Sequence, residues 1–328
     1  MVRTSAPTRI DLAGGTIDIW PLYLFHAGAQ TLNAAISIRA HALVEPRTDG
    51  RVVLRSEDTD ATVTVGHWRE LKDSKDLRLL ALLVHFFEVN GITLTTRSES
   101  PAGAGIAGSS ALNVAVCAAL SEWMQRAYEP EALLQVAMNV EAQVINVPTG
   151  LQDYRPAFYG GIAALELEAD GIHRVPLNVD LDSLEQRITL CYTGEPRNSG
   201  TNNWDITKKH IDGDRHIFDC FERIRDTAAA MRIALEAADW DAVGHAIAEE
   251  WRNRKRLSPG VTTPGIESLI ARAIAAGATA AKVCGAGGGG CLFCYGPPSA
   301  QPAIREALSA GGARLLDYQF ERTGLTRG

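Results

Sequence analysis

Two runs of glycine and other small residues are the strongest chemical signal in the sequence. PAGAGIAGSSAL spans residues 101–112 and KVCGAGGGGCLF spans residues 282–293. Glycine-rich turns free backbone N–H groups to bind an anion, above all where a helix begins directly after the turn. Both runs satisfy G-x-G-x-x-G, but the first lacks the strand and acid that a dinucleotide fold places about 20 residues further on. It also lacks the Gly-Lys-Ser/Thr of a Walker A loop. The first run therefore predicts a phosphate-binding loop of another kind.

A helix is expected to begin at Ser109 or Ser110, directly after this loop. The two hydroxyls could cap the helix, bind a phosphate oxygen or ligate magnesium. The plain structural alternative is a glycine turn with a serine cap. The second glycine run lies between apolar, strand-like segments, which indicates a close approach of its backbone to another element or to a ligand. We expect it to pack near Ser109 and Asp153.

A group of basic residues follows the segment YTGEPR in an otherwise acidic chain. If the substrate already carries a phosphate, such residues are candidates to hold it. The competing interpretation is a solvated helix face, balanced by Asp205, Asp212 and Asp214. Trp204 in the same segment either lines a sugar pocket or packs in the core. This basic group consists of Arg197, Lys208, Lys209, His210 and Arg215.

Strands and helices must position these residues. β-Branched residues between turn signals predict strands at residues 39–46, 51–56 and 62–65. Apolar periodicity predicts a helix within residues 76–91, then a strand that leads into the glycine loop. Two helices and two strands follow, up to a boundary at VDLDSLEQ. The second half begins with a strand and four helices and ends strand, glycine turn, strand, helix, strand. This order predicts an α+β protein with two domains, residues 1–180 and 181–328.

The overall composition excludes several classes of protein. The 328 residues carry a net charge of −7, and 22% of them are charged, which favours a soluble globular protein and no nucleic-acid or anionic-membrane partner. The six cysteines lie mostly in apolar segments and are predicted to be reduced thiols of the core. No apolar stretch approaches the ~18 residues of a membrane span, and the first residues lack a signal-peptide pattern. We expect a cytoplasmic location.

Three segments resemble, in order, the three motifs of the GHMP kinases, the superfamily of galactokinase, homoserine kinase, mevalonate kinase and phosphomevalonate kinase. They are APTRIDLAGG, PAGAGIAGSSAL and KVCGAGGGGCLF. LAGGTIDIWPLY, GLQDYRPAFYGG and YTGEPR are most similar to sugar kinases of the D-glycero-D-manno-heptose 7-phosphate kinase type. The resemblance implies an N-terminal domain like domain 2 of ribosomal protein S5 and a C-terminal ferredoxin-like α+β sandwich. It also implies an ATP-dependent kinase that phosphorylates a hydroxyl of a sugar or sugar phosphate, with ATP and Mg²⁺ as cofactors.

The same resemblance assigns roles to individual residues. Asp153 matches the catalytic base, which must reach the acceptor hydroxyl, and Arg9 matches the arginine that approaches it. Ser110 and Glu141 match the ligands of Mg²⁺. The phosphates of ATP are expected over Gly103, Ala104, Gly105, Ile106, Ala107, Gly108, Ser109 and Ser110. Contacts to the acceptor are expected from Asp18, Gly15, Arg197, Gly287 and Gly288.

Two segments depart from the family pattern. Ala107 replaces an expected glycine, which is tolerable if this residue avoids positive φ. NSGTNNWDITKKHIDGDRH, after YTGEPR, does not follow the heptose kinase pattern and leaves the identity of the sugar open. Two alternatives therefore stay open: a kinase for another acceptor, such as a free sugar or a mevalonate-type precursor, and a non-catalytic sensor of ATP or sugar. A homodimer is also open.

Overall fold

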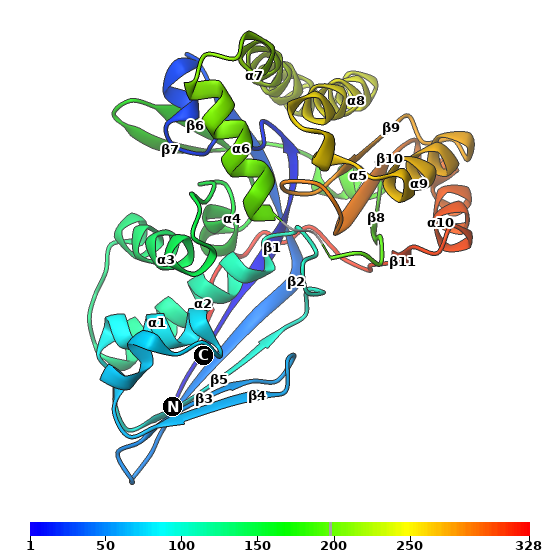
Figure 1. Ribbon diagram of the computed structural model, residues 1–328. Coiled ribbons are helices and arrows are strands. Elements are labelled where there is room, and N and C mark those ends of the chain that lie inside the picture. Colours follow the sequence, from blue (N-terminus) through cyan, green and yellow to red (C-terminus); the bar gives the residue numbers. More distant parts are fainter. Residues whose placement is uncertain (197–198) are drawn as a thin grey trace.

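A long eight-stranded sheet forms the larger half of the molecule (Figure 1). The computed structural model describes residues 1–196 and 199–328. The strands lie in the order β12-β1-β2-β5-β3-β4, and β6 continues from β2 to β7. Only β3 and β5 pair in parallel within this sheet. The strands are β1 (Val2–Ala13), β2 (Gln30–Pro46), β3 (Val52–Ser56), β4 (Ala61–Val65), β5 (Ile92–Ser98), β6 (Ile162–Glu168), β7 (Gly171–Pro176) and β12 (Thr326–Arg327).

Strands β1 and β2 carry the first candidate residues into the centre of the molecule. They pair antiparallel, with Arg9 opposite Ala35 and Asp11 opposite Asn33. The sequence predicted only the second half of β2 and missed β1. The physical reason is that residues 6–13 and 30–36 are buried on both faces of the sheet, so they lack the alternation of polar and apolar side chains that marks a half-exposed strand.

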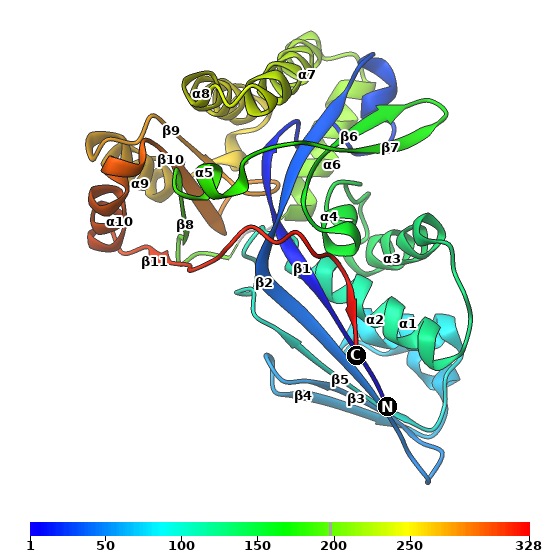
Figure 2. The same cartoon turned by 180° about the vertical axis from the view of Figure 1, so that it is seen from behind.

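Four helices cover one face of this sheet (Figures 1 and 2). They are α1 (Arg78–Phe87), α2 (Gly108–Trp123), α3 (Pro130–Ile145) and α4 (Tyr154–Tyr159). The central helix, α2, packs its small residues against β1 and β2, and Thr4 donates a hydrogen bond from its hydroxyl to the carbonyl of Ala115 at 2.7 Å. This close packing fixes the start of α2 relative to β1. The predicted helices after the glycine loop are confirmed.

The second half contains a smaller antiparallel sheet with the order β11-β8-β10-β9. Its elements follow the predicted order: a strand, four helices, then strand, glycine turn, strand, helix and strand. They are α5 (Leu181–Glu185), β8 (Ile188–Tyr192), α6 (Ser199–Ile211), α7 (Arg215–Glu236), α8 (Trp240–Leu257), α9 (Pro264–Ala275), β9 (Ala280–Val283), β10 (Cys291–Tyr295), α10 (Gln301–Ala310) and β11 (Arg314–Leu315). Four short 3₁₀ helices, η1 (Leu22–Phe25), η2 (Trp68–Asp73), η3 (Pro259–Val261) and η4 (Pro298–Ala300), complete the described elements. The mixed α and β content confirms the predicted α+β class.

The end of the chain returns to the first sheet. Strand β12 pairs antiparallel with β1, with Thr4 opposite Arg327, and Phe320 forms an isolated bridge with Ile36. Figure 2 shows the two termini side by side at one end of the long sheet. A division of the chain at residue 180 therefore separates residues that hydrogen-bond in one sheet. The sequence did not predict β12 because a two-residue strand carries too little pattern to be recognised.

Two further predictions concern buried residues and membranes. All six cysteines are buried, as predicted for thiols of the core. Among the helices in the described part of the chain, none has the length and apolar character required to span a bilayer.

Candidate active site

Both glycine runs meet at a cavity of about 540 Å³ between the two halves of the molecule. Its wall includes the loop before α2, the end of α3, the loop from Val147 to Asp153 and the β1–β2 connection. Gly285 and Ala286 of the second run line the same cavity as Ser109 and Asp153. The structure therefore places the second glycine run near Ser109 and Asp153, as predicted.

The first turn of α2 opens toward this cavity without a capping side chain. The N-cap residue is Ala107, which makes no side-chain cap hydrogen bond, and the residues at 103–105 and 107–110 line the cavity. Gly103 and Gly105 have φ of 65° and 78°, which glycine adopts at low cost. The first N–H groups of an uncapped helix and the positive end of its dipole together attract an anion. The hydroxyl of Ser110 does not cap the helix, because it donates to Glu141.

Ala107 lies in the left-handed region, with φ of 62° and ψ of 33°. The sequence-based condition that this residue avoids positive φ is therefore not met. This conformation costs an L-residue with a Cβ about 1–2 kcal/mol. The strain is held by packing, since Ala107 is buried and the next turn of α2 is clamped between β1 and α3. An alanine thus occupies a backbone conformation that favours glycine.

Replacement of Ala107 by glycine should change the free energy of unfolding by less than about 0.5 kcal/mol. The relief of positive φ offsets the lost methyl burial of about 0.8 kcal/mol and the greater entropy of the unfolded glycine chain. The matched control is Ala111→Gly, one turn later in α2 and fully buried in helical geometry, where nothing offsets a loss of about 1–2 kcal/mol. Urea unfolding of both variants measures the difference. Equal losses in the two variants would contradict strain at Ala107.

The second glycine run acts by its close approach to the first. A Cβ on Gly290 would lie 2.6 Å from the carbonyl oxygen of Ala104, and the N–H of Cys291 donates to the same oxygen at 2.6 Å. Gly287 and Gly288, expected to contact the acceptor, instead pack on Val261, whose carbonyl accepts a hydrogen bond from Gly288 N–H at 2.8 Å. Neither of these two lines the cavity in the part of the chain that is described. The second run therefore packs directly against the first glycine run at Ala104.

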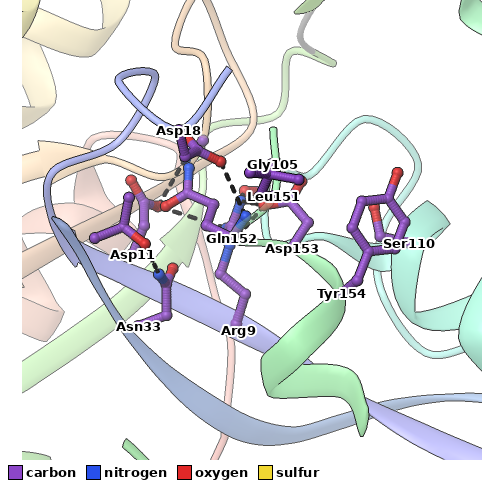
Figure 3. Close-up of polar contacts among 12 residues, drawn as sticks. Arg9, Asp11, Asp18, Asn33, Gly105, Ser110, Leu151, Gln152, Asp153 and Tyr154 are labelled. Atoms are coloured by element: carbon purple, nitrogen blue, oxygen red, sulfur yellow. Dashed lines mark hydrogen bonds and ion pairs between the residues drawn. The ribbon is translucent and has the colours of Figure 1, made fainter. Parts of the chain in front are cut away.

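Arg9 and Asp153 form the central ion pair of the site (Figure 3). Nη2 and Nε of Arg9 both donate to Oδ1 of Asp153, at 2.5 and 3.1 Å. Nη1 of Arg9 donates to the carbonyl of Gly105 at 2.8 Å, which ties β1 to the glycine loop. Arg9 is fully buried, whereas Asp153 is 20% exposed and lines the cavity. Both bonds from Arg9 reach one oxygen, and Oδ2 of Asp153 has no donor among the described residues.

Beneath this pair lies a buried ion pair that the sequence analysis missed. Nζ of Lys282 donates to the side chain of Asp11 at 2.9 Å and to its backbone carbonyl at 2.7 Å. The N–H of Gly285 donates to the other carboxylate oxygen of Asp11 at 2.8 Å. Burial alone raises the pKa of Asp11, but the charges of Lys282 and Arg9 outweigh it and lower that pKa. A lysine within the apolar strand AAKVC was the available signal, since a charge inside a buried strand requires a partner.

Gly15, predicted to contact the acceptor, faces the interior instead. A Cβ there would lie 2.5 Å from Nη1 of Arg254, and the adjacent Gly14 donates its N–H to Glu250 at 3.2 Å. Arg254 in turn donates to the carbonyl of Gly285 at 2.6 Å. Glu250 and Arg254 are buried residues of α8. The β1–β2 connection is thus held on the second half of the molecule from below the cavity.

Glu141 and Ser110 lie side by side in the cavity wall. Oε2 of Glu141 accepts hydrogen bonds from the hydroxyls of Ser110 at 3.0 Å and Tyr154 at 2.7 Å. Both partners are neutral, and burial raises the pKa of Glu141 although these hydroxyls oppose the shift. A carboxylate and a hydroxyl are hard oxygen donors of the kind that Mg²⁺ takes alongside several waters. The donor set therefore fits one magnesium ion, whose charge would compensate the buried carboxylate.

Asp18 projects into the cavity from the β1–β2 connection (Figure 3). Its Oδ2 accepts a hydrogen bond from Gln152 N–H at 2.9 Å, whereas Oδ1 is buried and has no partner in the described structure. Burial, assisted by the charge of Asp153, raises the pKa of Asp18 to about 6, against the opposing hydrogen bond from Gln152. This carboxylate is thus destabilised in the unliganded protein.

The Asp18→Asn variant should be more stable than the wild type, by at most about 3 kcal/mol at pH 8 and about half of that at pH 5. The sign follows from proton binding. With a folded pKa of about 6 against 3.8 unfolded, the folded state holds more protons between these values, so wild-type stability falls as pH rises through this window. The full penalty is present above pH 6 and absent below about pH 4. Denaturant unfolding at several pH values measures it, and a gain that does not vary with pH would contradict the shifted pKa.

The described members of the basic group predicted to hold a substrate phosphate do not line the cavity. Arg197 lies outside the described residues. Lys208 and Arg215 form exposed helical ion pairs with Asp212 and Asp219, and Lys209 is exposed. His210 is buried with its Nε2 2.8 Å from Nε2 of His26, and burial together with His26 lowers its pKa to about 4. The described members therefore form a solvated helix face and a neutral buried histidine.

The neighbouring residues of α6 show which side of this helix meets the cavity. Trp204 is 50% exposed and is not part of the described cavity wall. Asn203 does line the cavity, and its Oδ1 is buried with no partner among the described residues. Sequence analysis did not single out Asn203 or Gln152. Gln152 stands in the quoted segment GLQDYRPAFYGG, but neither residue carries a charge, so only their position in the cavity distinguishes them from ordinary polar residues.

Comparison with known proteins agrees with this geometry. The model of the GHMP kinases N terminal domain matches residues 75–161, and that of the GHMP kinases C terminal domain matches residues 231–314. A D-glycero-alpha-D-manno-heptose 7-phosphate kinase of Campylobacter jejuni is 28% identical, over 99% of this chain and 98% of that protein. An L-fucokinase/L-fucose-1-P guanylyltransferase of Bacteroides fragilis is 27% identical over 97% of this chain and 37% of that longer protein.

The fold is also that of solved structures. A D-glycero-D-manno-heptose 1-phosphate kinase from Bacteroides thetaiotaomicron superposes with a TM-score of 0.80, at 23% identity, over 100% of this chain and 99% of that one. Both family models match in the expected order, and the first includes the glycine loop, Glu141 and Asp153. With its two-domain architecture and both glycine runs at one cavity, the chain belongs to the GHMP kinase family.

Proposed function

We propose that the protein is an ATP-dependent kinase that transfers the γ-phosphoryl group of ATP to a hydroxyl of a sugar or sugar phosphate. One observation carries the proposal. The Arg9–Asp153 pair lies in the same cavity as the uncapped start of α2, and it leaves one oxygen of the Asp153 carboxylate available. A phosphate-binding helix start next to an oriented carboxylate is what phosphoryl transfer to an alcohol requires. The similarity to a heptose 7-phosphate kinase supports a sugar acceptor.

In this mechanism the glycine loop binds the phosphates of ATP. The N–H groups of residues 103–110, apart from that of Ala104, which donates to Pro101, and the positive end of α2 stabilise the charge on the phosphate oxygens. Arg9 fixes the carboxylate of Asp153 through Oδ1. The free oxygen of Asp153 accepts the proton of the acceptor hydroxyl as the oxygen attacks the γ-phosphorus in line with the leaving ADP oxygen. Arg9 also bonds the loop carbonyl of Gly105, so base and phosphate loop keep one relative position.

The charge on the phosphates calls for a divalent cation as well. Glu141 and Ser110 are the residues that would hold Mg²⁺, because their oxygens converge beside the glycine loop and Glu141 has only neutral partners. When bound, the ion would neutralise phosphate charge and orient the phosphates. Tyr154 keeps the carboxylate of Glu141 aimed at this position by donating to Oε2.

A coupled assay of ADP formation tests the proposal. The panel contains D-glycero-D-manno-heptose 7-phosphate, the unphosphorylated heptose, free hexoses and pentoses including L-fucose, and mevalonate with its phosphates, each with ATP and Mg²⁺. We expect turnover with one or more sugars or sugar phosphates and none with the isoprenoid precursors. Turnover with mevalonate alone would show a kinase of another acceptor class. ATP binding without any turnover across the panel would favour a sensor.

A further inference from the structure

Three side-chain oxygens of the described cavity wall have no partners, and the segments that carry them share one apolar cluster through Ile19, Leu151 and Ile206. Asp18 comes from the β1–β2 connection, Gln152 precedes Asp153, and Asn203 lies on α6. Oδ1 of Asp18, Oε1 of Gln152 and Oδ1 of Asn203 are each buried and have no hydrogen-bond donor in the described structure. Asp18 and Gln152 are more than nine-tenths buried, and Gln152 N–H joins them directly. Three segments distant in sequence thus present unsatisfied oxygens to one cavity.

Unpartnered acceptor oxygens favour a ligand that donates hydrogen bonds to them. A buried acceptor atom without a donor is costly, and a ligand that donates to it recovers that cost. Hydroxyl groups donate to a carboxylate, and because they both donate and accept they satisfy either end of an amide. A phosphate offers only acceptor oxygens at neutral pH and is repelled by a carboxylate. The raised pKa of Asp18 is consistent with this environment, since burial of the carboxylate outweighs the backbone hydrogen bond from Gln152 and the charge of Arg9 that stabilise its ionised form.

The cations of the site are already engaged. Arg9 is the one basic side chain among the described residues that line the cavity, and its guanidinium bonds Asp153, Asp11 and the carbonyl of Gly105. Lys208 is exposed on α6 and paired with Asp212. The described wall around Asp18 is therefore polar and acidic, which suits uncharged hydroxyls.

The family resemblance already implies that Asp18 contacts the acceptor. We propose that Gln152 and Asn203 join it to bind an uncharged, hydroxyl-bearing part of the acceptor sugar, and that Asn203 is a specificity-determining residue of this subsite. The inference rests on the proposed function. It adds that the part of the acceptor bound by Asp18, Gln152 and Asn203 is uncharged. A phosphate already present on the acceptor projects away from these three residues. Asn203 sets which sugars fit because it is the member contributed by α6, within the segment that departs from the heptose kinase pattern.

Helix α6 is anchored well enough for this role. Ile206 and Thr207 are buried, and His210, at the far end of the helix, contacts His26, which in turn lies 2.6 Å from Glu222 of α7. The rings of Phe218 and Phe221 pack against the same histidines. The side chain at position 203 is thus presented by a helix fixed to α7 and to η1.

The test compares two substitutions at one position. Binding of the unphosphorylated heptose and of heptose 7-phosphate is measured by calorimetry for the wild type, Asn203→Ala and Asn203→Asp, with the exposed neighbour Asp205→Ala as control. Asn203→Ala should weaken both sugars by about tenfold, the loss of roughly one hydrogen bond to a buried group, and leave ATP affinity unchanged. Asn203→Asp keeps an acceptor oxygen and adds a charge, so it should change both sugars by the same factor. Asp205→Ala should bind both sugars as the wild type does.

Three outcomes would overturn the inference. Affinities of Asn203→Ala within twofold of the wild type would remove Asn203 from the subsite. A loss in Asn203→Asp that is confined to the phosphorylated sugar would place the phosphate at this end. A wild type that binds none of the sugars and sugar phosphates of the panel would remove the subsite altogether. These results are separate from failure of the proposed function, which is read from ADP formation: a protein can bind sugars as described here without transferring phosphate.

Discussion

The Asp153→Asn variant should lose turnover by about 10²–10⁴-fold while its affinity for ATP stays within about twofold of the wild type. The amide keeps the size of the side chain and can still accept from Arg9 through one oxygen, but it cannot take up the proton of the acceptor hydroxyl. In the proposed mechanism the nucleotide binds to the glycine loop and the start of α2, to which Asp153 does not belong. Initial rates with the best acceptor of the panel give kcat, and calorimetry gives the affinity for ATP.

Two controls separate chemistry from folding in this experiment. Asp153 shares an ion pair with the fully buried Arg9, so the thermal midpoint of the variant shows whether the pair has been disrupted. Glu141→Gln provides the contrast, because loss of the proposed magnesium ligand should raise KM for ATP with magnesium, an effect not expected of Asp153→Asn. Turnover of Asp153→Asn within tenfold of the wild type would show that another group takes the proton.

The Lys282→Met variant should lose about 3–5 kcal/mol of the free energy of unfolding. Methionine fills most of the space but leaves the carboxylate of Asp11 buried without its nearest cation, and an uncompensated buried charge is costly. The pKa of Asp11 should rise in this variant because the charge of Lys282 contributes to its low value. Asp11→Asn added to Lys282→Met should therefore recover part of the loss. Urea unfolding of the single and double variants measures both effects.

Lys255→Met is the matched control for this prediction. Lys255 forms a similar ion pair with Glu267 at 3.1 Å, but both side chains are about a third or more exposed, so its loss should cost no more than about 1 kcal/mol. If Lys282→Met also cost less than 1 kcal/mol, the buried pair would not support the site. The same clamp positions Gly285, which donates to Asp11, so the variant should bind ATP more weakly than Lys255→Met does.

The strained and unsatisfied groups of this protein gather around one cavity. Ala107 has positive φ at the start of α2. Asp18 has a buried carboxylate with a raised pKa, and one of its oxygens has no hydrogen-bond partner in the described structure. We therefore expect Asp18→Asn to raise the free energy of unfolding and Ala107→Gly to leave it nearly unchanged. Both expectations mean that the wild-type residue lowers the stability of the protein at this site. Sites that bind and transform ligands commonly show this pattern, because groups arranged for the ligand are left unsatisfied without it.

Much of the site could be recognised in the sequence because its signals are local. Glycines at fixed spacing before a helix encode a phosphate-binding turn, and Asp153, Glu141, Arg9 and Ser110 stand in short motifs that resemble those of one family. The order of elements was predicted for the same reason, since helical periodicity and turn residues act over a few positions. The strands β1 and β2 were largely missed, because burial on both faces removes the periodic signal.

Only the tertiary structure decided which of these residues work together and in what environment. Lys282 and Asp11 are 271 positions apart, and their pairing depends on how β9 meets β1 rather than on either local sequence. The same holds for Lys208, which belongs to a basic run but points to solvent, and for Asn203, which has no motif but lines the cavity. By itself, then, the sequence determined the phosphate-binding turn, the family motifs and the order of elements. Burial, ion pairing and the polarity of the cavity wall were decided by the fold, because these properties depend on neighbours that are distant along the chain.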